Sequence, residues 1–154
     1  MTATPLTVYE SPEEKVSVLE LYTSHGCSSC PPADAWLRTL TARPGLWREF
    51  IPVAFHVDYW NDLGWPDQFA AEGFSERQRD YFRKGHLSGI YTPGFVLRGR
   101  EWRGWFRGRA PDFTPQARVG KLSLALDDDQ RALIRFNPQE SVDPSQLTAH
   151  LAVL

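Results

Sequence analysis

The two cysteines of this chain, Cys27 and Cys30, stand three residues apart directly after an apolar run at 16–22. A C-x-x-C pair between a predicted strand and a predicted helix is typical of a dithiol/disulfide redox centre. One helical turn brings both sulfurs within bonding reach, because a disulfide needs a Cα separation of about 4.4–6.8 Å. The sequence therefore predicts a strand, a reactive pair and a helix in that order.

Other interpretations of the pair stay open. A structural disulfide closing so short a loop would restrain little unfolded-state entropy, so it would contribute little to stability. A zinc site needs two further ligands, and the chain has no second C-x-x-C pair. Soft thiolates do select copper(I) or zinc, so Cys27 and Cys30 with His25 or His56 form the alternative, a metal-binding module or metallochaperone. In a third interpretation the chain is an interaction domain whose cysteines serve only as packed side chains. The favoured redox interpretation needs no cofactor and no resident metal.

Composition narrows the classes of partner. The 154 residues carry a net charge of −2, with 42% apolar and 23% charged residues, which is typical of a soluble globular domain. Arginines alternate with aromatic residues at 98–109, but the rest of the chain is not basic, so we expect no nucleic-acid binding. No run approaches the roughly 18 apolar residues of a membrane helix, so we also expect no membrane span. Residues 1–15 lack the features of a signal peptide. The sequence as written predicts a cytoplasmic protein, or a periplasmic or secreted one if a leader was removed.

Hydrophobic patterning predicts an α/β core followed by a β-rich extension. A helix opens at Pro31, where a missing N–H removes no helical bond, and Arg43-Pro44-Gly45 stops it. A capping box from Ser75 to Gln78 starts a second helix that runs to about Gly85. Strands are expected at 16–22, 51–57, 94–98 and 101–106. Strands separated by helices imply a parallel core, and the terminal hairpin adds an antiparallel edge, in the order β-α-β-α-β-β.

The sequence changes character after Pro111. A linker at 111–115 leads into three β-like segments at 119–126, 131–137 and 147–154. We therefore expect one domain at 1–110 and a β-rich extension at 111–154. The last segment runs to the final residue without a polar cap, which indicates a chain cut within a small β unit or one that borrows a partner's strand.

The attacking species in disulfide exchange is the thiolate, and a helix N-terminus favours an anion. Cys27 is nearer to the turn, so we expect it to be exposed and to act as the nucleophile. Cys30 is then the partly covered resolving thiol. Because Cys30 precedes Pro31, and a residue before proline avoids helical angles, Cys30 is expected to be an N-cap.

Several blocks of the sequence resemble a known family. The strand, the C-x-x-C motif and a Thr-Pro before the third strand are similar to the thioredoxin fold. The segments LELYTSHGCSSCPPAD at 19–34, HVDYW at 56–60 and YTP at 91–93 resemble the bacterial DUF1223 family of thioredoxin-like proteins, as does the region around Gln78-Arg79. The resemblance covers residues 16–109. Members of that family usually carry a leader peptide and a longer C-terminal β portion.

The resemblance implies roles for particular residues. Pro93 matches the thioredoxin cis-proline that faces the cysteines, and cis costs little before proline. The backbone at Thr92 would then pair with an incoming substrate chain. The implied activity is a thiol–disulfide oxidoreductase, and the implied partner is a protein disulfide or a small thiol such as glutathione.

Further residues are candidates for supporting roles. Glu20 lies inside an apolar strand and is a candidate proton relay for Cys30, the alternative being a paired structural carboxylate. Thioredoxin's buried acid would fall on Leu21, and on a strand Glu20 points to the opposite face. His25 could stabilise the Cys27 thiolate when it is protonated.

The second predicted strand supplies the remaining candidates. His56 and Asp58 alternate along it and should share one face at the strand end where parallel sheets place ligands. They are candidates for substrate or metal contact, or for holding the following loop. Trp60 in that loop is a candidate wall of a cleft, as is Trp65.

Overall fold

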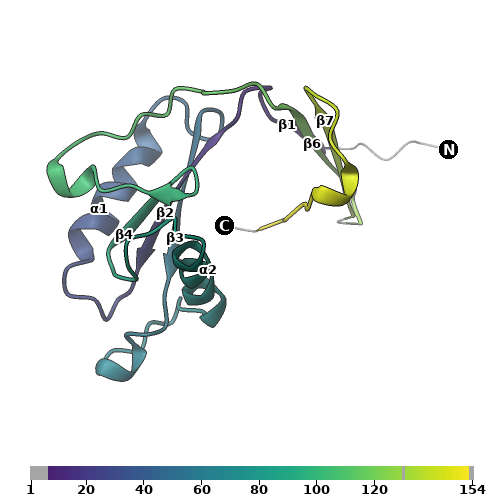
Figure 1. The fold of residues 1–154 in the computed structure, drawn as a ribbon. Helices are drawn as coiled ribbons and strands as arrows, with labels where there is room; N and C mark the ends of the chain where they lie inside the picture. The colour runs from purple at the N-terminus through teal and green to yellow at the C-terminus, as the bar shows by residue number, and fades with distance from the viewer. Residues whose placement is uncertain (1–6, 130, 153–154) are drawn as a thin grey trace. The chain divides into compact units, whose positions relative to one another are not determined.

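The computed structural model describes residues 7–129 and 131–152 and shows a mixed α/β chain (Figure 1). It divides into two compact units. One is Val16–Phe113, and the other joins the chain up to Lys15 with the chain from Thr114 onward. The sequence-based division at 110 grouped the N-terminal residues with the first unit. In the structure, β1 (Thr7–Glu10) instead pairs antiparallel with β6 (Gly120–Leu126) of the second unit.

The first unit is built on one four-stranded sheet with the order β3-β2-β4-β5. Its elements are β2 (Ser17–Thr23), α1 (Pro31–Thr39), β3 (Phe50–His56), α2 (Glu72–Arg83), β4 (Gly94–Leu97) and β5 (Arg100–Glu101). Strands β2 and β3 are parallel, while β4 and β5 add antiparallel neighbours. The predicted order of strands and helices in this unit is confirmed.

The alternation of side chains along β2 assigns each helix to one face of the sheet. Leu19 and Leu21 belong to the core cluster that includes Ala33 and Leu37 of α1. Tyr22 belongs to a second cluster, which packs against Tyr81 of α2. The two helices therefore cover opposite faces of the sheet (Figure 1), and the chain between β2 and α1 emerges at the edge where the parallel strands end.

Two local predictions for this unit are wrong. Helix α2 begins at Glu72, three residues before the predicted capping box, because the Ser75 hydroxyl is buried and bonded to Asp58 instead of capping the helix. The predicted strand at 101–106 stops at Glu101, and a 3-10 turn follows at Trp105–Arg107. The hairpin turn lies at 98–99, where both residues have positive φ, as a type I′ turn requires.

The second unit is an antiparallel sheet with the order β1-β6-β7, in which β7 is Ala132–Pro138. The expected strands at 119–126 and 131–137 are confirmed to within one residue, but β1 was not expected. The strand expected at 147–154 is absent from residues 147–152, and its last two residues lie outside the described chain. Within the described residues, no helix has the length and apolarity needed to cross a membrane.

Candidate redox site

The structure joins Cys27 and Cys30 in a disulfide with a Cα separation of 5.4 Å. The pair lies in the loop between β2 and α1. The Cys27 N–H donates to the Ser24 carbonyl at 3.1 Å, and the Cys30 N–H donates to the Cys27 carbonyl at 3.2 Å. These consecutive turns hold the two residues at bonding distance, so the predicted junction of strand, cysteine pair and helix is confirmed.

Burial of the pair differs from the prediction. Cys27 is only 3% exposed and Cys30 is fully buried, so the expectation of an exposed Cys27 is wrong. The connection after β3 packs against the residue before Cys27: a Cβ on Gly26 would lie 3.1 Å from Cβ of Trp60. Of the two cysteines, Cys27 is still the more accessible. Its Sγ lies 3.5 Å from the hydroxyl of Ser29.

The start of α1 combines a helix dipole with few free N–H groups. Cys30 is the N-cap, as predicted, although its backbone is helical (φ −79°, ψ −33°) despite the following proline. Pro31 and Pro32 carry no N–H. The N–H groups of Ala33 and Asp34 both donate to the Cys30 carbonyl. A thiolate here would therefore be stabilised by the dipole rather than by direct N–H bonds from the first turn.

The Thr92–Pro93 segment lies at the same end of the sheet. Its peptide bond is cis, as the resemblance implies. The register pairs Tyr22 with Gly94, which places Pro93 beside the carboxyl end of β2, where the cysteine loop begins. Trp60 donates from Nε1 to Oγ1 of Thr92 at 2.8 Å. Trp60 thus contacts both the Thr-Pro segment and the cysteine loop.

Two further hydrogen bonds hold Tyr91, the residue before Thr92. Gln78 donates from Nε2 to the Tyr91 carbonyl at 2.9 Å, and the Tyr91 hydroxyl donates to Glu101 at 2.5 Å. Burial raises the pKa of Glu101, but hydrogen bonds from Tyr91 and Ser88 outweigh it, so its pKa lies below the usual value. Tyr91, which precedes Thr92, is therefore bonded both to α2 and to β5.

Glu20 is 2% exposed and points to the α2 face of the sheet. Arg77 donates to its Oε1 from Nε at 2.9 Å and from Nη2. The hydroxyls of Tyr22 and Tyr81 also reach the carboxylate, at 3.3 and 3.4 Å, and burial raises the pKa of both tyrosines. These contacts are those of a paired structural carboxylate. Leu21, the neighbouring residue, faces α1, as the alternation of the strand predicts.

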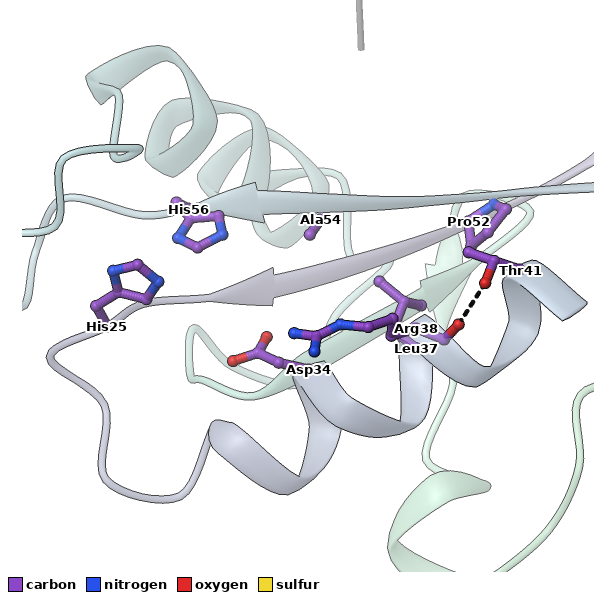
Figure 2. A pocket seen from close by; sticks show the side chains of 8 residues that line it. All are labelled: His25, Asp34, Leu37, Arg38, Thr41, Pro52, Ala54 and His56. Atoms are coloured by element: carbon purple, nitrogen blue, oxygen red, sulfur yellow. Dashed lines mark hydrogen bonds between the residues drawn. The ribbon is translucent and has the colours of Figure 1, made fainter.

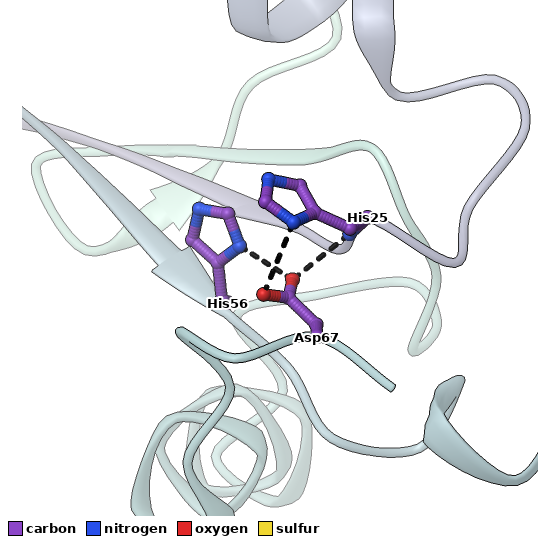
Figure 3. A group of neighbouring side chains, drawn as sticks. All are labelled: His25, His56 and Asp67. Carbon is purple, nitrogen blue, oxygen red and sulfur yellow. Dashed lines mark hydrogen bonds and ion pairs between the residues drawn. The ribbon is translucent and has the colours of Figure 1, made fainter. Parts of the chain in front are cut away.

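His25, His56 and Asp67 form a cluster at the carboxyl ends of β2 and β3 (Figure 3). His56 donates from Nδ1 to Asp67 Oδ2 at 2.6 Å, and Nδ1 of His25 lies 3.5 Å from Asp67 Oδ1. Asp67 also accepts the backbone N–H groups of His25 and Phe69, at 2.8 and 2.9 Å. Burial raises the pKa of the Asp67 carboxyl, but these bonds outweigh it and hold the pKa below its usual value.

Asp58 does not join this cluster. Strand β3 ends at His56, so the alternation expected to align the two side chains does not extend to Asp58. Asp58 accepts the hydroxyl of Ser75 at 2.5 Å, and its N–H donates back to the same oxygen at 2.9 Å. This pair attaches the end of β3 to α2, which matches the loop-holding alternative for Asp58.

A pocket of about 310 Å³ adjoins the cluster on the α1 side of the sheet (Figure 2). His25 and His56 form one end of it. Asp34 and Arg38 contribute opposite charges from α1, and Pro52 and Ala54 of β3 form its floor. Because β3 is the edge strand, the pocket opens at the side of the sheet.

Comparison with known proteins identifies the family. The family model described as "Protein of unknown function (DUF1223)" matches residues 18–121. This chain belongs to the DUF1223 family. Among solved structures, this DUF1223 protein is similar to an X-ray crystal structure of a protein from Agrobacterium tumefaciens, with 45% sequence identity and a TM-score of 0.47. That match covers 55% of this chain and 36% of the other. A search of curated proteins found no match.

Two residues of the site region in this DUF1223 protein were missed from sequence. Asp67 lies in the long irregular connection after β3, and Arg77 lies on α2. The available signal for Asp67 was the length of that connection, since long loops are usually functional or packed by their own side chains. For Arg77 the signal was Glu20 itself, because a carboxylate inside an apolar strand requires a buried partner.

Proposed function

We propose that this DUF1223 protein is a thiol–disulfide oxidoreductase of thioredoxin-like architecture. The observation that carries the proposal is the Cys27–Cys30 disulfide at the start of α1, with Thr92–Pro93 at the same sheet edge. The order of strands and helices in the first unit supports it. A C-x-x-C pair held at a strand-to-helix junction can cycle between bonded and free sulfurs.

The proposed reduction of a substrate disulfide proceeds in two exchanges. The Cys27 thiolate attacks one substrate sulfur, forms a mixed disulfide and releases the other substrate sulfur as a thiolate. The Cys30 thiolate then attacks the Cys27 sulfur, which releases the first substrate sulfur and restores the Cys27–Cys30 bond. The two electrons pass from the protein pair to the substrate. Oxidation of a substrate dithiol is the same sequence in reverse.

The assignment of roles follows from burial. Both cysteines are buried, but Cys30 is fully buried whereas Cys27 keeps 3% of its surface, so we propose that an incoming sulfur reaches Cys27 first. Substrate backbone beside Thr92 would lie along the edge where the cysteine loop emerges. A protein disulfide fits this arrangement, and a small disulfide such as oxidised glutathione is a suitable probe. The His25 side chain is 43% exposed and lies in the loop after β2 that also carries Cys27. We therefore propose that His25 stabilises the Cys27 thiolate.

The test is to trap the intermediate. Reduced Cys30→Ser protein, incubated with oxidised glutathione, should accumulate a stable mixed disulfide at Cys27 because the resolving thiol is missing. Intact-mass measurement should show one added glutathionyl group. The matched variant Cys27→Ser loses the same bridge but should accumulate little adduct, since its remaining sulfur is buried. Equal labelling of the two variants, or no labelling of either, would refute these roles.

A further inference from the structure

We propose that His25, His56 and Asp67 bind a divalent first-row metal ion, with zinc as the model, independently of the two sulfurs. The three residues come from three separate parts of the first unit. His56 ends β3, His25 follows the neighbouring strand β2, and Asp67 lies in the connection after β3. Parallel strands place such groups together at their carboxyl ends, where this fold class binds ligands. The proposal does not depend on the redox role of Cys27 and Cys30.

The spacing of the ligand atoms suits a metal ion. One donor atom from each of the three residues lies within 4.8 Å of the other two. Zinc bonded to nitrogen and oxygen at about 2.0–2.2 Å in tetrahedral geometry holds its ligand atoms about 3.3–3.6 Å apart. His25 Nδ1 already lies 3.5 Å from Asp67 Oδ1. The shorter contact between His56 Nδ1 and Asp67 Oδ2, 2.6 Å, is a hydrogen bond whose proton the metal ion would replace, and the two atoms would then have to move apart.

The carboxylate is held in position by the backbone. Each Asp67 oxygen accepts one main-chain N–H, from His25 on Oδ2 and from Phe69 on Oδ1. The Asp67 N–H donates to the side chain of Asn61 at 2.9 Å. Each carboxylate oxygen therefore accepts one backbone N–H and still has a lone pair that faces an imidazole ring. Such outer hydrogen bonds orient metal ligands and strengthen binding.

The charge balance also favours a cation. The Asp67 side chain is fully buried, and its hydrogen bonds supply partial charges only, so a bound cation would compensate the carboxylate more completely. A neutral imidazole brings no positive charge, whereas a divalent ion brings two. Phe69 packs edge-on against both rings, with centroids 5.6 Å away, and keeps part of the cluster apolar. Imidazole with one carboxylate suits zinc and its neighbours rather than calcium or magnesium, which prefer oxygen ligands.

The site keeps room for an exogenous ligand. Three protein ligands leave one position of a tetrahedral ion open, as in catalytic zinc sites. His25 and His56 also form one end of the 310 Å³ pocket (Figure 2). Thr23 pairs in register with His56, and its buried Oγ1 has no hydrogen-bond partner among the described residues. This hydroxyl therefore lies on the strand next to His56.

The test is zinc titration of the untagged, oxidised protein, followed by calorimetry. Oxidation removes both thiolates, so binding must use other ligands. We expect one zinc per chain, and at least about tenfold weaker binding in His25→Ala, because one ligand is lost. His25 is 43% exposed, so this variant should keep its fold, which circular dichroism checks. The matched control is His150→Ala, an exposed histidine of the second unit, which should bind as the wild type does.

Each other outcome contradicts the proposal. Absence of binding to the oxidised protein, or unchanged binding in both His25→Ala and His56→Ala, would overturn it. Binding that occurs only after reduction, and that is lost in a Cys27/Cys30 double serine variant, would assign the metal to the thiolates instead. The cobalt(II) spectrum provides a second readout, because sulfur ligands add charge-transfer bands that nitrogen and oxygen ligands lack. The glutathione trapping experiment is run without metal, so its result stands separately.

Discussion

Replacing Cys27 with serine is expected to lower the rate of disulfide reduction at least about 100-fold. A serine hydroxyl is not ionised at neutral pH, and it forms no bond to substrate sulfur that Cys30 can resolve. Cys30 does not substitute for it, because it is fully buried at the N-cap of α1. The measurement is the steady-state reduction of a protein disulfide with dithiothreitol as the electron source.

Cys30→Ser is the matched control for this variant. It loses the same bridge and therefore the same contribution to stability, but it keeps the nucleophile. With excess small thiol to resolve the mixed disulfide, Cys30→Ser should retain measurable turnover while Cys27→Ser does not. If Cys27→Ser kept wild-type activity, Cys27 would not be the nucleophile. A larger loss in Cys30→Ser than in Cys27→Ser would reverse the two roles.

Replacing Arg77 with methionine is expected to lower the free energy of unfolding by about 3 kcal/mol. Breaking a buried ion pair by removing one partner typically costs about 3–5 kcal/mol, since the other charge stays buried. The lower end applies here because Arg77 is half-exposed and two tyrosine hydroxyls still reach Glu20. Urea unfolding at neutral pH measures the change.

The same helix offers a control for the Arg77 variant. Arg79 pairs with Glu76 at 3.1 Å, with both side chains substantially exposed, so Arg79→Met should cost at most about 0.5 kcal/mol. Adding Glu20→Gln to Arg77→Met should recover part of the lost stability, because the buried charge is then removed. Equal costs for Arg77→Met and Arg79→Met would show that Glu20 does not depend on its arginine.

The elements around the cysteines could be predicted because their signals are local. An apolar run, a C-x-x-C pair and two prolines specify strand, loop and helix within about twenty residues of sequence. The separation of Glu20 from the α1 face also follows from the two-residue period of a strand. In the structure, Leu21 packs toward α1 and Glu20 contacts Arg77 of α2.

What could not be predicted depends on contacts between distant segments. Asp67 contacts His25 although 42 residues of sequence separate them. Strand β1 pairs with β6 although the sequence of the whole first unit lies between the two strands. The connection carrying Trp60 packs against Gly26, beside the buried Cys27, and no local pattern specifies that contact. Ser75 shows the same limit: its sequence context is that of a helix cap, but the tertiary contact with Asp58 determines its role.

The most direct test of the redox assignment is the reduction potential of the Cys27–Cys30 pair, measured by equilibration in a glutathione series and quantified by thiol alkylation. A redox-active pair should give one two-electron transition with a potential between about −270 and −120 mV. The protein should stay folded on both sides of that transition. A potential below about −300 mV would mark a structural bond and contradict the assignment, as would a pair that becomes reducible only when the protein unfolds.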